Sequence, residues 1–167
     1  MISNGPTPLT DDHNLDNFNS GVDTLDNWLT DKASKNQKGN ASRTYVVSED
    51  KNVIAYYSLA TGSIMSQEAI SKFKRNIPNP ILVIILGRLA VDKNYQGKGF
   101  DRYLVRDAAI RVTQAADLVG IRGLIVHAIS EDAKAFYKSV GFDESPLNPM
   151  TLMITLKDLK TAFGIKG

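Results

Sequence analysis

The sequence predicts an α/β fold, more narrowly an α+β arrangement on a mixed, mostly antiparallel sheet. Two β-rich segments, 43–48 and 53–64, enclose a polar turn, which is typical of a hairpin. A long helical pattern separates the apolar run 81–91 from a second apolar segment, 121–129, and such a strand–helix–strand unit forms a right-handed parallel crossover at the centre of the sheet. Together these observations exclude a helix bundle and a β-sandwich.

Helical spacing locates the flanking elements. It predicts a first helix over 22–38, capped by Ser20, with the apolar residues Val22, Leu25, Trp28, Leu29 and Ala33 on one face. A short helix is expected over 67–74, and a further helix over 131–140 that ends at Gly141. The segment 150–156 should close the sheet, with a short helix after it.

The central strand and helix carry the strongest apolar patterns. The run 81–91 is apolar enough to predict a strand buried on both faces. After the loop 94–99, a long helix should end at Gly120. Its apolar face consists of Leu104, Ala108, Val112, Ala115 and Val119.

Length and composition narrow the classes of function. A chain of 167 residues with 43% hydrophobic and 23% charged residues is expected to form one domain, residues 1–167, around a substantial core. It contains no cysteine, so disulfides, thiolate nucleophiles and cysteine-bound zinc are excluded. The longest uninterrupted apolar run, 81–86, is too short to span a bilayer, and no secretory signal is visible. We therefore expect a cytoplasmic protein without a membrane partner.

Charge is unevenly distributed along the chain. The formal net charge is +2, but residues 1–31 contain six aspartates and no lysine or arginine, so the rest of the chain carries +8. Such an asymmetry points weakly to a polyanionic partner for the basic part. A solvated surface with an uneven division of charge is the alternative.

The segment 88–102 combines the end of a strand, a loop with two glycines and the start of a helix. Backbone N–H groups at a helix start are unpaired and carry partial positive charge, and glycines allow a ligand to approach them closely. Lys98 and Arg102 add positive charge, so the segment fits a phosphate or pyrophosphate. An ordinary strand-to-helix turn is the alternative, because neither a Walker motif nor a full dinucleotide fingerprint is present.

Two motifs make the chain resemble the GNAT acetyltransferase superfamily. Residues 96–101, Gln-Gly-Lys-Gly-Phe-Asp, match the superfamily's pyrophosphate-binding loop at their first and fourth positions. Residues 133–142, Ala-Lys-Ala-Phe-Tyr-Lys-Ser-Val-Gly-Phe, are similar to its Ala-x-x-Phe-Tyr-x-x-x-Gly-Phe ending. Segments 18–21, 42–45, 86–92 and 149–156 further resemble the toxins of type II toxin–antitoxin systems that acetylate aminoacyl-tRNA. The resemblance covers roughly residues 9–159 and implies the GNAT fold.

The resemblance implies acetyl-CoA as co-substrate, with backbone groups of 89–91 on the pantetheine arm and residues 96–102 on the pyrophosphate. Tyr137 would be the general acid that protonates the departing CoA thiolate, since a phenol with a usual pKa of about 10 is protonated at neutral pH. Its helical spacing alone favours a core aromatic at Tyr137, and the two motifs together reverse this interpretation. The implied cofactor-binding set is Leu89, Ala90, Val91, Gln96, Gly97, Lys98, Gly99, Phe100, Asp101, Arg102, Ser130, Ala133 and Phe136.

The implied nucleophile is the α-amine of the amino acid on a charged tRNA, and no metal is needed. No side chain is identified as general base, for which an ordered water is the candidate; His127 is expected to be a packed strand residue. Arg43, Arg88 and Lys93 are the candidates for contacts with tRNA. A ribbon-helix-helix antitoxin and a second copy of the chain, in a homodimer, are the implied partners.

Asp101 departs from the family pattern, which has Gly or Ala at this position. An aspartate in the first turn favours the empty helix by about 0.3–1 kcal/mol, but it would face the pyrophosphate when acetyl-CoA is bound. Repulsion at about 4 Å costs roughly 1–4 kcal/mol, depending on the local dielectric, or about fivefold to a thousandfold in affinity. We therefore expect Asp101 to weaken acetyl-CoA binding.

Three functions follow from the sequence. The first is a toxin that N-acetylates aminoacyl-tRNA and blocks translation, attenuated by Asp101. The second is an acetyltransferase for a protein or small-molecule amine, because the fold does not determine the acceptor. The third is a catalytically disabled form that only binds an antitoxin or another copy of itself.

Overall fold

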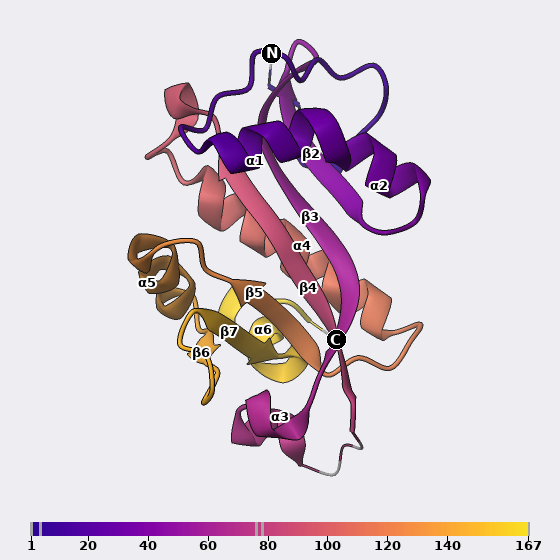
Figure 1. Cartoon of the computed structure of the whole chain (residues 1–167), viewed down its shortest axis with the longest axis vertical. Helices are drawn as coiled ribbons and strands as arrows, with labels where there is room; N and C mark the ends of the chain where they lie inside the picture. The colour runs from indigo at the N-terminus through magenta and orange to yellow at the C-terminus, as the bar shows by residue number, and fades with distance from the viewer. Residues whose placement is uncertain (1, 4, 76, 78, 167) are drawn as a thin grey trace. The chain divides into compact units, whose positions relative to one another are not determined.

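The computed structural model describes residues 2–3, 5–75, 77 and 79–166. Within these residues seven strands form one sheet in the order β1-β2-β3-β4-β5-β7-β6 (Figure 1). The strands are β1 (Thr7–Pro8), β2 (Arg43–Glu49), β3 (Asn52–Ile64), β4 (Ile81–Val91), β5 (Gly123–His127), β6 (Asp143–Glu144) and β7 (Thr151–Thr155). The β4–β5 pair is parallel, and β1–β2, β2–β3, β5–β7 and β6–β7 are antiparallel, which confirms the mixed sheet.

The helical elements agree in order with the sequence prediction. They are α1 (Asp23–Trp28), η1 (Leu29–Ala33), α2 (Ser34–Lys38), η2 (Ser66–Glu68), α3 (Ser71–Lys74), η3 (Lys93–Tyr95), α4 (Phe100–Ala116), α5 (Glu131–Ser139) and α6 (Leu156–Phe163). The chain divides into two compact units. The first contains residues up to Ala60 together with Gly87–Ala108, and the second contains Thr61–Leu86 and the chain from Ala109 onward.

The core of the first unit lies between the 23–38 helical segment and the strands β2 and β3 (Figure 1). The Tyr56 ring stacks on Trp28 at 5.9 Å between centroids and meets Phe18 edge-on at 5.5 Å. Its hydroxyl donates to the carbonyl of Leu25 at 2.6 Å. Burial raises the pKa of Tyr56 above its usual range, opposed by the nearby charge of Arg88. This phenol therefore stays protonated and fixes the helix on the sheet.

The first helix differs from its prediction at its start and in its middle. It begins after Val22 without a side-chain cap, and the Ser20 hydroxyl instead donates to Asp26 Oδ1 at 2.6 Å. Ser20 is therefore not the N-cap, because its side chain is used to fix the turn before the helix. Residues Leu29–Ala33 form a π-helical turn between two α-helical segments, and spacing alone does not signal this insertion.

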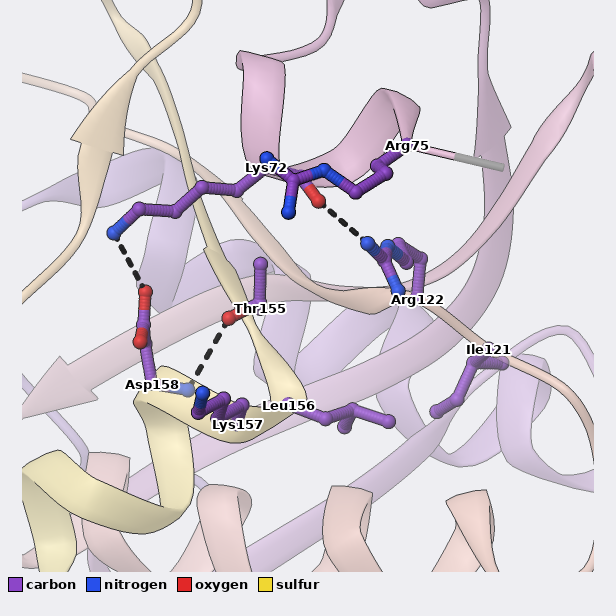
Figure 2. A pocket seen from close by; sticks show the side chains of 8 residues that line it. All are labelled: Lys72, Arg75, Ile121, Arg122, Thr155, Leu156, Lys157 and Asp158. Atoms are coloured by element: carbon purple, nitrogen blue, oxygen red, sulfur yellow. Dashed lines mark hydrogen bonds and ion pairs between the residues drawn. The ribbon is translucent and has the colours of Figure 1, made fainter. Parts of the chain in front are cut away.

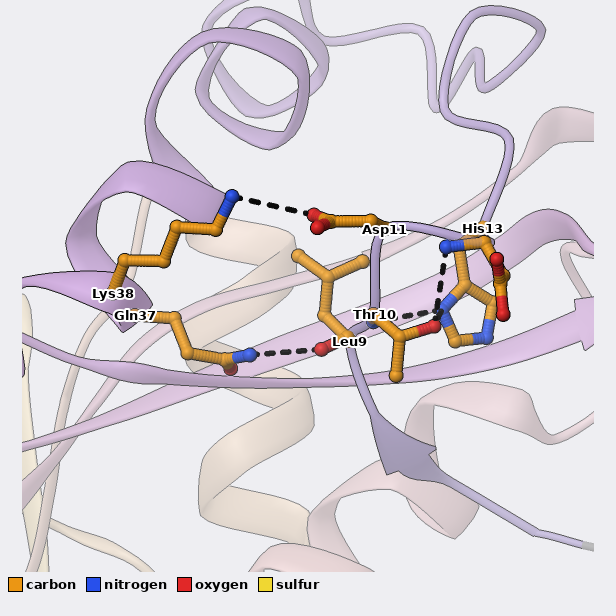
Figure 3. Close-up of polar contacts among 7 residues, drawn as sticks. Leu9, Thr10, Asp11, His13, Gln37 and Lys38 are labelled. Carbon is orange, nitrogen blue, oxygen red and sulfur yellow. Dashed lines mark hydrogen bonds and ion pairs between the residues drawn. The ribbon is translucent and has the colours of Figure 1, made fainter.

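Side chains of α2 contact the polar N-terminal segment, residues 9–13 (Figure 3). Gln37 Nε2 donates to the Leu9 carbonyl at 2.8 Å, while its Oε1 accepts the N–H of Thr44 at 3.0 Å, so one amide joins this segment to β2. The His13 ring accepts the N–H of Thr10 at 3.0 Å. The exposed Lys38–Asp11 ion pair, at 3.4 Å, contributes little to stability. These contacts hold residues 9–13 beside β2, where the preceding residues form the edge strand β1.

Three of the apolar patterns include residues that the structure leaves exposed. The prediction that 81–91 is buried on both faces is wrong at Leu82, which is 55% exposed, and at Gly87 and Arg88, which are exposed. The helix α4 ends at Ala116, so Val119 is 58% exposed and does not belong to its apolar face. Likewise β5 ends at His127 and leaves Ile129 63% exposed. At Val119 and Ile129 the apolar sequence continues past the end of the element, whereas Leu82 lies within β4 on its exposed face.

Gly123 begins β5 where two elements approach closely in the second unit. A Cβ at this position would lie 2.2 Å from the Ile154 carbonyl oxygen and 2.7 Å from the Phe73 ring. We predict that Gly123→Ala lowers the free energy of unfolding by about 1–3 kcal/mol, as measured by urea denaturation. Gly120→Ala is the matched control, because a Cβ there meets nothing within 4 Å among the described residues. Equal stability of the two variants would contradict this packing.

Candidate functional site

Two side chains hold the loop after β4 in place, in the first unit. The Asp92 carboxylate, 7% exposed, accepts the N–H of Asn19 at 3.0 Å and that of Asn94 at 2.9 Å. Gln96 Nε2 donates to the carbonyls of Ser20 and Val91, both at 2.8 Å. The Nε2 group of Gln96 therefore positions the loop by joining it to the segment before α1 and to the end of β4. Sequence reasoning missed Asp92 as an anchor, although an aspartate directly before a turn is a typical cap.

The loop presents an open backbone surface at its glycines. Gly97 and Gly99 have φ angles of +78° and +86°, in the left-handed region that side chains disfavour. A Cβ at either would meet no described atom within 4 Å, so their conformation rather than crowding requires glycine. Lys98 lies over the Tyr95 ring, with Nζ 5.6 Å from its centroid. Such a loop at a helix start can receive a phosphate group.

Asp101 lies in the first turn of α4, exposed to solvent. Its Oδ1 accepts the backbone N–H of Arg102 at 2.8 Å. This N–H belongs to the group of donors at the helix start that would bind a pyrophosphate. The Asp101 carboxylate thus occupies one backbone donor at the start of α4.

The end of β4 offers backbone groups to an extended ligand. The parallel pairing with β5 runs from Ile84, opposite Leu124, to Leu86, opposite Val126. Leu89, Ala90 and Val91 continue β4 beyond the last of these pairs. The Val91 carbonyl already accepts Gln96. An extended arm that adds to this strand edge would use the remaining groups, as in β-strand addition.

Tyr137 lies on α5 in the second unit, 6% exposed. Its ring lies 5.2 Å from Phe136 and 5.5 Å, edge-on, from Phe142. Helix α5 starts at Ser130, whose hydroxyl oxygen accepts the N–H of Ala133 at 3.1 Å. The two motifs of the sequence thus fall in different units, the loop in the first and the Ala133–Phe136–Tyr137 group in the second.

Glu144 joins α5 to β6. Its Oε1 lies 3.0 Å from Lys138 Nζ and 3.1 Å from Lys134 Nζ, and the hydrogen bond from Lys138, then that from Lys134, lowers the pKa of Glu144. Its contribution to stability is therefore present above pH 4.5 and is lost as the pH falls through the lowered folded value.

We predict that Glu144→Gln reduces the acid-dependent part of the stability. Between pH 6 and pH 3 the free energy of unfolding should fall less in the variant than in the parent protein, as followed by denaturant titration at each pH. Lys138→Gln should give an intermediate pH dependence, because Lys134 still pairs with the carboxylate. An identical fall in parent and Glu144→Gln would contradict the assignment.

The candidate tRNA-binding residues lie in the first unit, and two of them also support the fold. Arg43 Nη1 donates to the Gln37 carbonyl at 2.8 Å and Nη2 to Asn40 Oδ1 at 3.0 Å, so it caps the end of α2. The Arg88 guanidinium lies 4.6 Å above the Trp28 ring. Lys93 is exposed, with its side chain over Gly21. Because Arg88 stacks on Trp28 by the face of its guanidinium, its N–H edges stay available for phosphate.

The structure offers no second catalytic or metal site at the histidines or carboxylates of the described residues. His127, expected to be packed, is exposed at the end of β5, where Nδ1 lies 3.0 Å from Thr151 Oγ1. In the described part of the chain no three His, Cys, Asp or Glu side chains are grouped as metal ligands would be. No described helix is both long and apolar enough to cross a bilayer.

Comparison with known proteins shows the family of the chain. Residues 40–144 match the model of the acetyltransferase (GNAT) domain. The chain is 40% identical to the tRNA-acetylating toxin of Mycobacterium tuberculosis (strain ATCC 25618 / H37Rv) over 159 residues, which cover 95% of this chain and 96% of the relative.

Solved structures show the same likeness. AtaT complexed with acetyl-methionyl-tRNAfMet superposes with a TM-score of 0.88 and 33% identity, covering 98% of this chain and 99% of that one. A mutant AtaT bound to the C-terminus of the antitoxin AtaR and acetyl-CoA gives a TM-score of 0.82 and 29% identity, covering 98% and 99%. The chain belongs to the GNAT acetyltransferases and, within them, to the tRNA-acetylating toxins.

Proposed function

We propose that this chain is a toxin that transfers acetyl from acetyl-CoA to the α-amine of aminoacyl-tRNA and so blocks translation. The observation that carries the proposal is the pair of preserved elements: an anion-receiving loop at 96–102 and a tyrosine-bearing helix at 131–139, in a chain 40% identical to a tRNA-acetylating toxin. Acylation of the α-amine removes the nucleophile that an aminoacyl-tRNA needs to accept a growing peptide.

Most of the residues present fit acetyl-CoA, with one exception. The backbone of Gly97 and Gly99, with Lys98 and Arg102, suits the pyrophosphate, and the 89–91 edge suits the pantetheine arm. Asp101 opposes the pyrophosphate by charge and by its bond to the Arg102 N–H. The loop therefore forms a receiving site whose affinity is reduced by one side chain.

In the proposed reaction the α-amine attacks the acetyl carbonyl carbon, so a C–N bond forms and the C–S bond of the thioester breaks. The Tyr137 hydroxyl gives its proton to the departing thiolate. The proton of the attacking amine passes to water, since no side chain is assigned as base. Because Tyr137 is nearly buried, bulk water has little access to its hydroxyl proton.

The partners of the proposed toxin are an antitoxin and a second copy of the chain. One AtaT structure contains the C-terminus of the antitoxin AtaR. We infer a ribbon-helix-helix antitoxin, a homodimer and a cytoplasmic location, with the whole chain acting as one acetyltransferase domain. Co-expression with its antitoxin and sedimentation of the free chain test the first two.

Cell-free translation tests the proposed function. Adding the protein with acetyl-CoA should stop protein synthesis, and fresh aminoacyl-tRNA added after removal of the protein should restore it. The Asp101→Gly variant should act at lower acetyl-CoA concentrations. If synthesis continues with both proteins although the Gly form binds acetyl-CoA, the acceptor is a protein or small amine. Bulk tRNA would then inhibit acetylation only at low salt, without being labelled.

Asp101 supports a second candidate, in which the chain is a catalytically disabled form that binds its antitoxin. The hydrogen bond that the Arg102 N–H donates to Asp101 is the observation that favours this second candidate. This candidate predicts that the chain binds antitoxin as tightly as Asp101→Gly does, while only the variant stops translation.

A further inference from the structure

A surface pocket of about 440 Å³ lies in the second unit, beside α3 and the first turn of α6 (Figure 2). Four cationic side chains line it: Lys72, Arg75, Arg122 and Lys157. Its one carboxylate is Asp158. The sequence already shows a basic run at Lys72, Lys74 and Arg75, and the structure adds Arg122 and Lys157 from two other segments.

The structure fixes two of these cations. Arg122 donates from Nη2 to the Lys72 carbonyl at 2.6 Å and from Nε to the Phe73 carbonyl at 3.2 Å, so its guanidinium closes the end of α3 and is held rigidly. Lys72 Nζ lies 2.9 Å from Asp158 Oδ2, and this hydrogen bond raises the pKa of Lys72, which stays charged. Asp158 is thereby neutralised.

The remaining positive charge is uncompensated. Among the described residues no carboxylate pairs with Arg75, Arg122 or Lys157. With four cations and one carboxylate, the pocket carries a net charge of +3. Like charges held together in a concave surface repel one another, and a multivalent anion that binds between them relieves this repulsion. A preoriented guanidinium matches two oxygens of one phosphate.

We propose that this cluster of Lys72, Arg75, Arg122 and Lys157 binds backbone phosphates of the tRNA substrate. The inference rests on the proposed function, since RNA is the substrate there. It adds a second basic region to Arg43, Arg88 and Lys93, which lie in the other unit. Phosphate contacts of this kind position an RNA without reading its sequence. RNA is favoured over an acidic protein because the cations converge in one pocket, where a phosphate can meet several of them.

The test uses a double variant, Arg75→Gln with Lys157→Gln. Both residues are exposed, and Arg122 is left unchanged because it closes α3. Binding of deacylated bulk tRNA should weaken about tenfold, and the slope of log affinity against log salt should fall in magnitude by about 1 to 2. The charge-matched control replaces two exposed lysines outside the pocket, Lys51→Gln with Lys166→Gln, and should bind tRNA as the parent does.

Kinetics in the Asp101→Gly background separate the possible outcomes. The double variant should raise KM for aminoacyl-tRNA by a similar factor and leave KM for acetyl-CoA and kcat within about twofold. Unchanged tRNA affinity and salt slope, with aminoacyl-tRNA still acetylated, overturn the phosphate site alone. Lost antitoxin binding with unchanged tRNA binding also overturns it and assigns the pocket to a protein. If the Asp101→Gly protein with an unchanged pocket does not acetylate tRNA, it is the proposed function that fails.

Discussion

Replacing Tyr137 by phenylalanine should reduce kcat for acetyl transfer by about 10²–10⁴-fold, the usual contribution of a positioned general acid. The ring keeps its contacts with Phe136 and Phe142, so the thermal midpoint and the Kd for acetyl-CoA should stay close to those of the parent. The substitution removes the hydroxyl group, and the thiolate then departs without its proton.

The measurement is steady-state transfer of labelled acetyl, made in the parent chain and in the Asp101→Gly background. Phe142→Leu is the matched control, since it disturbs the same aromatic cluster and keeps the phenol. It should lower stability more than kcat. If Tyr137→Phe retains kcat within about threefold, Tyr137 is a packing residue and the proton comes from elsewhere.

Asp101→Gly should raise the affinity for acetyl-CoA, by about five- to fiftyfold. The change removes a negative charge beside the pyrophosphate and makes the Arg102 N–H available to it. Because Asp101 is exposed, water and salt screen the repulsion, and we expect the lower part of the range that Coulomb's law allows. Calorimetric titration with acetyl-CoA at low and high salt measures the effect.

Asp101→Asn separates charge from occupancy. It removes the charge but keeps an oxygen that can accept the Arg102 N–H, so its affinity should fall between those of the parent and the Gly form. The free energy of unfolding should be highest in the parent and lowest in the Gly form. An acidic residue favours the helix start, and glycine disfavours it by roughly 1 kcal/mol. Equal acetyl-CoA affinity in all three proteins would remove the role of Asp101.

Several parts of the fold could be predicted because local sequence determines them. The bounds of β4 and the start of α5 agree with prediction, since a long apolar run and a Ser130 cap act within a few residues. The 96–101 loop was located for the same reason: glycines at positive φ leave a clear sequence signal.

The remaining features depend on contacts distant in sequence. Gln96 turns inward because the Ser20 carbonyl lies beside it, 76 positions away, and Arg43 serves α2 because that helix ends next to β2. The basic pocket joins α3 to Arg122, 49 positions beyond Phe73. No periodicity reports such neighbours, so the direction of these side chains could be learned only from the structure.

The most direct test of the account is the location of the transferred acetyl group. Charged tRNA is incubated with labelled acetyl-CoA and either this chain or Asp101→Gly, digested with nuclease, and analysed by mass spectrometry. We predict N-acetylaminoacyl-adenosine from the Gly form, and the same product at a lower rate from the parent chain. Acetyl found only on protein or small amines, while the Gly form binds acetyl-CoA, would contradict the account.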